Sequence, residues 1–140
     1  NPAIVYGLKL HLVDKIEGHT REITRFKDFY VDDADFLLIS YGSSARAALH
    51  LVRNRRARGE KLGLLELQTL WPFPAEEVKK RCASAQAIVV VEMNMGQIYH
   101  EVQKVVDNPD KIYLANQING HFITPTDILN ILRIIQGRGI

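Results

Sequence analysis

The sequence predicts an α/β fold, in which helices cover both faces of a mostly parallel sheet in three α/β/α layers, preceded by a long N-terminal helix. From residue 34 onward, short apolar runs alternate with helical stretches, which is the pattern of strand-helix units. These runs lack strict polar alternation, as expected of strands that are covered on both faces. The four expected strands are 36–39, 62–65, 87–91 and 112–115.

Residues 1–33 are expected to form a helical entry segment to the α/β domain of residues 34–140. Apolar side chains recur at three- and four-residue steps between residues 8 and 29, which predicts one long amphipathic helix. Gly18 weakens a helix by up to about 1 kcal/mol relative to alanine. A break near Gly18 and His19, giving two helices, therefore stays open as an alternative.

Four later helices are predicted from the chemistry of their ends. Gly59 suits the left-handed position that follows a helix, and Pro74 suits a first helical turn. Pro109 prevents the helix before it from continuing. Thr124 and Asp127 have the spacing of a capping box. The expected helices cover residues 44–58, a segment from 74, a segment from 96 that ends before 108, and 124–137.

Composition and charge exclude several classes of protein. The 140 residues are 46% hydrophobic and 24% charged, which suits one ordinary globular domain. The single cysteine, Cys82, excludes an internal disulfide and a cysteine-based zinc site, and we expect a cytoplasmic protein. A formal net charge of +2 gives no overall reason to expect nucleic acid as a partner. The apolar runs are far shorter than the ~20 residues of a membrane helix.

The first residues lack a signal-peptide pattern. They also lack an initiator methionine, so we expect either a processed chain or a fragment of a longer protein.

Three unusual loops follow the predicted strands, at residues 41–46, 68–74 and 92–97. Because parallel strands end at one edge of a sheet, these loops are expected to converge there. The first loop offers Gly42, Ser43, Ser44 and Arg46 as a candidate anion site, since helix N-terminal N–H groups and arginine bind phosphates and carboxylates. In the alternative interpretation, one of the serines only caps the helix.

The other two loops are candidate interface segments. Prolines hold Trp71 and Phe73 in a stiff segment that presents both rings to a neighbouring subunit, unless the rings fold back over their own core. Past the most apolar strand lie four further candidate interface residues: Glu92, Asn94, Gly96 and Gln97. A carboxylate there can act as a base or bind a cofactor group, but no second group completes a catalytic set, and structural hydrogen bonding is the alternative. We therefore expect no catalytic residue, and the histidine spacings suggest no metal ligand.

Together these loops resemble the C-terminal domain of 2-oxoacid:ferredoxin oxidoreductase α subunits, of the 2-oxoglutarate type. The resemblance covers roughly residues 8–136 and depends on the order of YGSSAR at 41–46, TLWPFP at 69–74 and VVEMN at 90–94, followed by Gly96 and Gln97. It implies a fold similar to the transketolase C-terminal domain. It also implies a parent complex that oxidatively decarboxylates a 2-oxoacid, forms an acyl-coenzyme A and reduces ferredoxin.

The resemblance further implies a non-catalytic assembly domain that binds no cofactor alone. Thiamine diphosphate, magnesium, an iron-sulfur cluster and coenzyme A are then expected elsewhere in the complex, since one cysteine cannot supply four cluster thiolates. The implied partners are a preceding thiamine-binding domain, the β subunit, ferredoxin through the complex, and a second protomer. Two alternatives stay open: an anion or coenzyme A binding module, and a stand-alone nucleotide-binding α/β protein.

Overall fold

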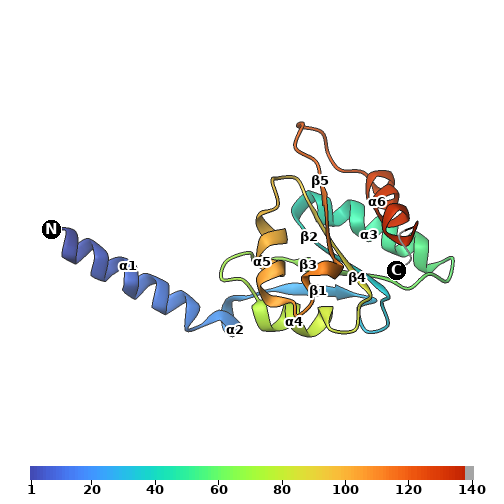
Figure 1. The fold of residues 1–140 in the computed structure, drawn as a ribbon. Coiled ribbons are helices and arrows are strands. Elements are labelled where there is room, and N and C mark those ends of the chain that lie inside the picture. The colour runs from blue at the N-terminus through green and yellow to red at the C-terminus, as the bar shows by residue number, and fades with distance from the viewer. Residues whose placement is uncertain (138–140) are drawn as a thin grey trace.

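A computed structural model describes residues 1–137 and confirms the predicted fold class (Figure 1). The sheet has five strands in the order β1-β3-β2-β4-β5. Strands β2, β3, β4 and β5 run parallel, and β1 pairs with β3 antiparallel at one edge. The strands are β1 (Phe26–Phe29), β2 (Phe36–Tyr41), β3 (Leu62–Leu67), β4 (Ala87–Glu92) and β5 (Ile112–Asn116).

Helices cover both faces of this sheet, which completes the three layers. Helices α4 and α5 pack together on one face, and α3 and α6 pack together on the other. Side chains of β2 alternate between the two cores, with Leu37 and Ile39 on the α4/α5 side and Leu38 on the α3/α6 side. The helices are α1 (Pro2–Glu17), α2 (Thr20–Ile23), α3 (Gly42–Arg56), α4 (Ala75–Cys82), α5 (Gln97–Val105), η1 (Pro109–Lys111) and α6 (Pro125–Gly137).

The ends of several helices follow the expected chemistry. Thr124 Oγ1 accepts a hydrogen bond from the Asp127 backbone N–H at 3.2 Å, and the Asp127 carboxylate accepts one from the Thr124 N–H at 2.8 Å. This is the reciprocal pattern of a capping box. The hydroxyl of Thr124 also donates to that carboxylate and lowers the pKa of Asp127. Gly59 has the predicted left-handed backbone, with φ at +81°, although α3 ends slightly earlier, at Arg56.

The predicted single helix through Phe29 is wrong. A break at Gly18 and His19 divides the entry segment into α1 and α2, and residues 26–29 form strand β1 instead. Tertiary contacts explain the strand: the Arg81 guanidinium lies 4.3 Å from the centre of the Phe26 ring and donates to Asp28 at 2.6 and 2.7 Å. These contacts and the antiparallel pairing with β3 override the helical spacing of the apolar residues.

The turn after β1 depends on a glycine in the neighbouring strand. A Cβ added at Gly63 of β3 would lie 2.6 Å from the Tyr30 carbonyl oxygen and 2.8 Å from the Ala34 Cβ. Only glycine lets the chain cross β3 this closely. β1 is therefore part of the sheet, although its residues fall within the segment 1–33 that was expected to be a helical entry segment.

Helix α1 projects away from the body of the molecule (Figure 1). None of its residues is buried, and its element neighbour is the short helix α2. No helix within residues 1–137 has the length and apolar character that a membrane span requires.

Candidate functional site

The loops that the sequence singles out converge on one edge of the sheet. Because β2, β3 and β4 are parallel and in register, their last residues, Tyr41, Leu67 and Glu92, lie at the same edge. We call this edge the carboxyl rim, formed by residues 41–46, 68–74, 92–97 and 117–124. Side chains connect neighbouring loops: the Tyr41 hydroxyl donates to Glu92 at 3.3 Å.

Glu92 stabilises the start of helix α5 from below the rim. Its side chain is fully buried, and its two oxygens accept hydrogen bonds from the backbone N–H groups of Ile98 and Tyr99, each at 3.1 Å. A carboxylate at a helix N-terminus also interacts favourably with the helix dipole. With the Tyr41 hydroxyl as a third donor, both oxygens are occupied, and the described residues contain no buried side-chain polar atom without a partner. In this chain the carboxylate has a structural role rather than that of an available base.

Asn94 closes the turn that links β4 to α5. Its Oδ1 accepts from the backbone N–H groups of Gly96 at 2.9 Å and Gln97 at 3.0 Å, while its Nδ2 donates to the Tyr41 hydroxyl. Gly96 has a left-handed backbone with φ at +98°, which favours glycine. The spacing of glutamate, asparagine, glycine and glutamine therefore follows from the hydrogen bonding of one tight turn.

Tyr41 joins the strand ends of β2 and β4 through its hydroxyl group. Partial burial, and next the negative charge of Glu92, raise the pKa of Tyr41 above its usual value of 10.0. The hydroxyl therefore stays protonated at neutral pH, where it donates to Glu92 and accepts from Asn94. This half-buried network makes the β4 end of the rim rigid.

The candidate anion residues do not all face solvent. Ser44 is buried, and its hydroxyl donates to the Tyr41 carbonyl at 2.7 Å and lies 2.9 Å from the Ser40 hydroxyl. The interpretation that a serine caps α3 is wrong, because Tyr41 is the N-cap residue and no side chain accepts from the first turn. Gly42, Ser43 and Arg46 are exposed at the start of α3. The anion site itself stays a prediction.

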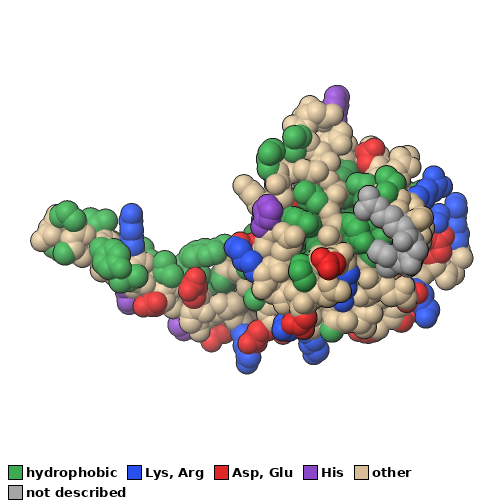
Figure 2. Space-filling view, in the orientation of Figure 1, with side chains coloured by type: hydrophobic (Ala, Val, Ile, Leu, Met, Phe, Trp, Pro, Cys, Tyr) green, Lys and Arg blue, Asp and Glu red, His purple; other side chains and the backbone are tan. Residues whose placement is uncertain are grey.

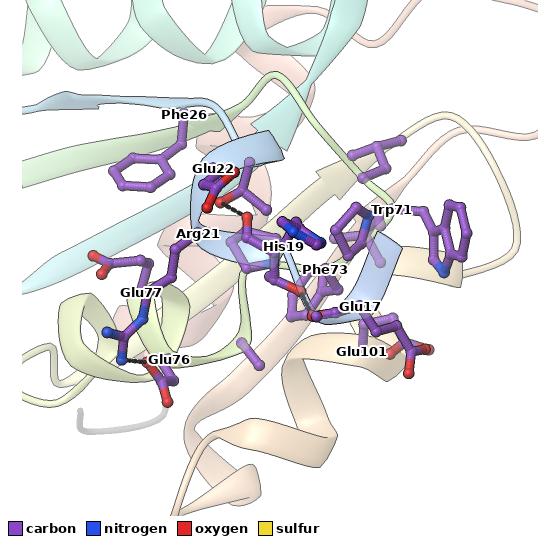
Figure 3. A pocket seen from close by; sticks show the side chains of 18 of the residues that line it. Glu17, His19, Arg21, Glu22, Phe26, Trp71, Phe73, Glu76, Glu77 and Glu101 are labelled. Carbon is purple, nitrogen blue, oxygen red and sulfur yellow. Dashed lines mark hydrogen bonds and ion pairs between the residues drawn. The ribbon is translucent and has the colours of Figure 1, made fainter. Parts of the chain in front are cut away.

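The two aromatic rings of the second loop differ in how far they are exposed to solvent. Phe73 is half-buried and packs against the core on the α4/α5 side, as the alternative interpretation expects. Trp71 is 56% exposed, so its ring does not fold back over the core. It lines an open cleft of about 1300 Å³ between residues 17–24, residues 70–77 and the start of α5 (Figure 3). We call this the Trp71 cleft.

Sequence reasoning missed the loop after β5. Residues 117–124 extend the rim and expose two large apolar side chains, Ile118 and Phe122, the latter at 72%; Met95 in the neighbouring turn is 75% exposed. The available signal was two large apolar residues placed among Asn, Gly and His, outside any helical or strand period. Exposed apolar residues gathered at one edge mark an interaction surface.

Cys82 is not a reactive thiol. Its side chain is buried, and this burial raises the pKa of Cys82 to about 12, which Lys111 opposes only partly. The Lys111 amine instead donates to the carbonyl oxygens of Cys82 and Ala85, at 2.8 and 2.9 Å, near the end of α4. Among the residues that the structure describes, no group of three His, Cys, Asp or Glu side chains is placed to hold a metal ion.

Comparison with known protein families identifies the family of the α/β domain. Residues 34–128, which include every strand of the parallel part of the sheet, match the model of the pyruvate:ferredoxin oxidoreductase core domain II. The chain belongs to this family. The match begins just before β2 and ends in α6, so the carboxyl rim lies entirely within core domain II.

Relatives of this core domain II are subunits of 2-oxoacid oxidoreductases. The chain is 36% identical over 130 residues to the 2-oxoglutarate synthase subunit KorA of Methanothermobacter marburgensis, covering 93% of this chain and 35% of the relative. The chain thus spans about a third of the length of that relative.

Solved structures support the fold of core domain II. A 2-oxoglutarate:ferredoxin oxidoreductase from Magnetococcus marinus, with 2-oxoglutarate, coenzyme A and succinyl-CoA bound, matches with a TM-score of 0.74 at 21% identity, over 83% of this chain and 20% of that chain. A split-gene transketolase, in the form of an inactive tetramer of four beta chains, matches with a TM-score of 0.65 at 16% identity, over 78% of this chain and 40% of that one. At these identities the likeness confirms the transketolase-like fold that the sequence predicts.

Proposed function

We propose that this core domain II is the non-catalytic assembly domain of a thiamine-diphosphate-dependent 2-oxoacid:ferredoxin oxidoreductase α subunit. The parent complex converts a 2-oxoacid, proposed to be 2-oxoglutarate, to its acyl-coenzyme A and reduces ferredoxin. The observation that most supports a non-catalytic role is the hydrogen bonding of Glu92, because both oxygens of this buried carboxylate accept hydrogen bonds, two from the start of α5 and one from Tyr41.

The cofactors are proposed to bind to other parts of the complex. The described residues do not fit thiamine diphosphate with its magnesium ion, since they offer no cluster of metal-ligating side chains. The buried Cys82 is one thiol, whereas an iron-sulfur cluster needs four. Coenzyme A is proposed to bind in the parent complex rather than to this domain alone.

The carboxyl rim is proposed as the docking surface. Its exposed apolar side chains suit burial against a protein partner, and the turn built by Glu92, Asn94, Gly96 and Gln97 fixes the shape of that surface. The proposed partners are the preceding thiamine-binding domain, the β subunit, a second protomer and, through the complex, ferredoxin. Residues 1–33 are proposed to lead into the docking domain of residues 34–140, with β1 as the part that joins the sheet.

A domain exchange tests this function. The matched third of the Methanothermobacter marburgensis KorA subunit is replaced by this chain, and the reconstituted complex is assayed for 2-oxoglutarate-dependent viologen reduction with coenzyme A and thiamine diphosphate. We expect the chimeric complex to turn over and the purified 140-residue chain to show no turnover. Robust activity of the purified chain would contradict the proposal.

A second candidate is anion binding by Gly42, Ser43, Ser44 and Arg46, with coenzyme A as the ligand to test. The observation that favours it is the uncapped start of α3, where Gly42 and Ser43 are exposed and Arg46 follows one turn later. Calorimetric titration with coenzyme A is the measurement. An absence of heat at millimolar ligand, or unchanged binding by the Arg46→Ala variant, removes this candidate.

A further inference from the structure

The loop after β5 contains the pair Asn119-Gly120, in which a residue without a side chain follows an asparagine. Among residues 1–137, the backbone N–H of Gly120 has no hydrogen-bond partner, and a Cβ added at Gly120 would meet no atom within 4 Å. Both residues are exposed, and Gly120 has a left-handed backbone with φ at +83°. The nitrogen of Gly120 is therefore unhindered and is not held by the fold.

The side chain of Asn119 is folded over the residues that follow it. Its Oδ1 accepts a hydrogen bond from the backbone N–H of His121 at 3.1 Å, in the turn that asparagine forms with the backbone two residues on. This hydrogen bond draws electron density out of the amide carbonyl group, so the carbon atom Cγ becomes a better electrophile. An electrophilic carbon and an unhindered nitrogen are thus direct neighbours along the chain.

The same side-chain turn occurs at three other asparagines: Asn1, Asn94 and Asn108. Proline follows two of them, at positions 2 and 109, and a proline nitrogen has no proton to lose. Met95 follows the third, and its side chain hinders the approach of its own nitrogen to the asparagine. Of these four turns, that of Asn119 alone has a following nitrogen that carries a proton and lacks a neighbouring side chain.

We propose that Asn119 is a site of spontaneous deamidation, at which this loop converts its own asparagine to aspartate and isoaspartate. Asparagine is a thermolabile residue in general. The Gly120 nitrogen loses its proton to water and forms a bond to Cγ of Asn119. The bond from Cγ to Nδ2 then breaks, and the nitrogen group takes up a proton and leaves as ammonia.

Water opens the cyclic imide that this step leaves behind. Addition of water at Cγ gives aspartate in the original backbone, and addition at the backbone carbonyl carbon gives isoaspartate, in which the chain continues through Cβ and Cγ. No atom is oxidised or reduced. The reaction needs only the atoms of Asn119 and Gly120 and water as co-reactant.

The product changes the charge of the loop. Residues 117–124 contain no Asp, Glu, Lys or Arg, and Figure 2 shows the tip of the loop without such side chains. The new carboxylate lies between the exposed apolar residues Ile118 and Phe122. Because burial of an unpaired charge is costly, the modified loop is a poorer surface for a protein partner. This consequence rests on the proposed function of the carboxyl rim, whereas the reaction itself does not.

Peptide mapping of the purified chain by mass spectrometry tests the reaction. The tryptic peptide of residues 112–133 carries Asn116, Asn119 and Asn130, so its fragment ions compare three asparagines in one molecule. We expect the acidic products to accumulate at Asn119 roughly tenfold faster than at the other two, and faster still at higher pH, because the attacking nitrogen must lose its proton. Gly120→Ala adds a side chain beside that nitrogen and should slow the reaction, and Asn119→Gln should stop it.

The chain unfolded in urea is the control for the effect of the fold. If Asn119 stays intact in the folded chain while the unfolded chain is converted, the proposal is overturned. Conversion of Asn116 at the same rate as Asn119 also overturns it. The route through the cyclic imide is overturned if Gly120→Ala reacts as fast as the parent chain, or if the product contains aspartate but no isoaspartate.

The KorA chimera tests the consequence for docking. Asn119→Asp places the same charge in the loop, and Asn119→Gln is the matched neutral control. The partner subunits are titrated into each chimera and viologen reduction is measured; we expect roughly tenfold weaker assembly for Asn119→Asp than for Asn119→Gln. Equal assembly of the two variants overturns the consequence for docking. A chimera that fails to assemble even with the unmodified loop counts against the proposed function, and leaves the peptide map as the test of the reaction.

Discussion

The turn after β4 and the loop after β3 leave the same edge of the sheet but are built in opposite ways. In the turn, Glu92 and Asn94 direct their polar atoms inward to backbone N–H groups and to Tyr41. In the loop, Trp71 directs an apolar ring outward. Polar residues at a strand end can therefore be wholly structural, whereas exposed apolar residues beside them mark the surface available to a partner.

The largest expected effect comes from removing the buried carboxylate. Glu92→Ala leaves the N–H groups of Ile98 and Tyr99 unpaired in the interior, so we expect the free energy of unfolding to fall by about 3 kcal/mol. Urea denaturation followed by circular dichroism measures this change. Glu92→Gln, which keeps one accepting oxygen, should lose less. If both variants are as stable as the parent chain, the structural role of Glu92 is wrong.

A smaller effect is expected for Asn94→Ala. The variant removes the acceptor for the Gly96 and Gln97 N–H groups, but Gln97 is exposed, so water can replace that part of the interaction. We expect a loss of about 1 to 1.5 kcal/mol in the same urea experiment. Asn94→Asp keeps the accepting oxygens and serves as the control, which should retain more stability than the alanine variant.

Much of the fold could be predicted because strand residues and helix ends obey local rules. The four parallel strands and the Thr124–Asp127 capping box were found from apolar runs and spacing alone. β1 could not be found this way, since its apolar residues also fit a helical period. Its structure depends on Arg81, which lies far along the chain and binds Asp28 over the Phe26 ring.

The candidate site was predictable in its position but not in the direction of its side chains. Parallel pairing placed the loops of Ser43, Trp71 and Glu92 on one rim, because every parallel strand ends there. Whether a side chain points inward or outward depends on single contacts that the sequence does not show. Ser44 and Glu92 point inward, and the apolar loop of residues 117–124 gave no periodic signal.

The hydrogen bonds of Tyr41 should make the free energy of unfolding fall as the pH rises into the alkaline range. The pKa of Tyr41 is raised in the folded state. The contribution of its protonated hydroxyl to the free energy of unfolding is therefore complete below pH 10 and is lost as pH rises through the folded pKa. Cys82, with a pKa raised to about 12, adds a similar loss that begins near pH 9. Tyr41 and Tyr41→Phe are therefore compared in chains that both carry Cys82→Ala. Above pH 10, we expect the urea midpoint of the chain with Tyr41 to fall faster with pH than that of the chain with Tyr41→Phe. Parallel pH profiles would contradict the assignment.

The smallest effect on stability is expected for Trp71→Ala. Because the ring is 56% exposed, its removal uncovers little apolar surface within one chain, and the free energy of unfolding should change by less than about 0.5 kcal/mol. Phe73→Ala, two residues away in the same loop, is the matched control and should lose about 2 kcal/mol because its ring packs against the core. A large loss for Trp71→Ala would place that ring in the core as well, and the contrast between the turn and the loop would then disappear.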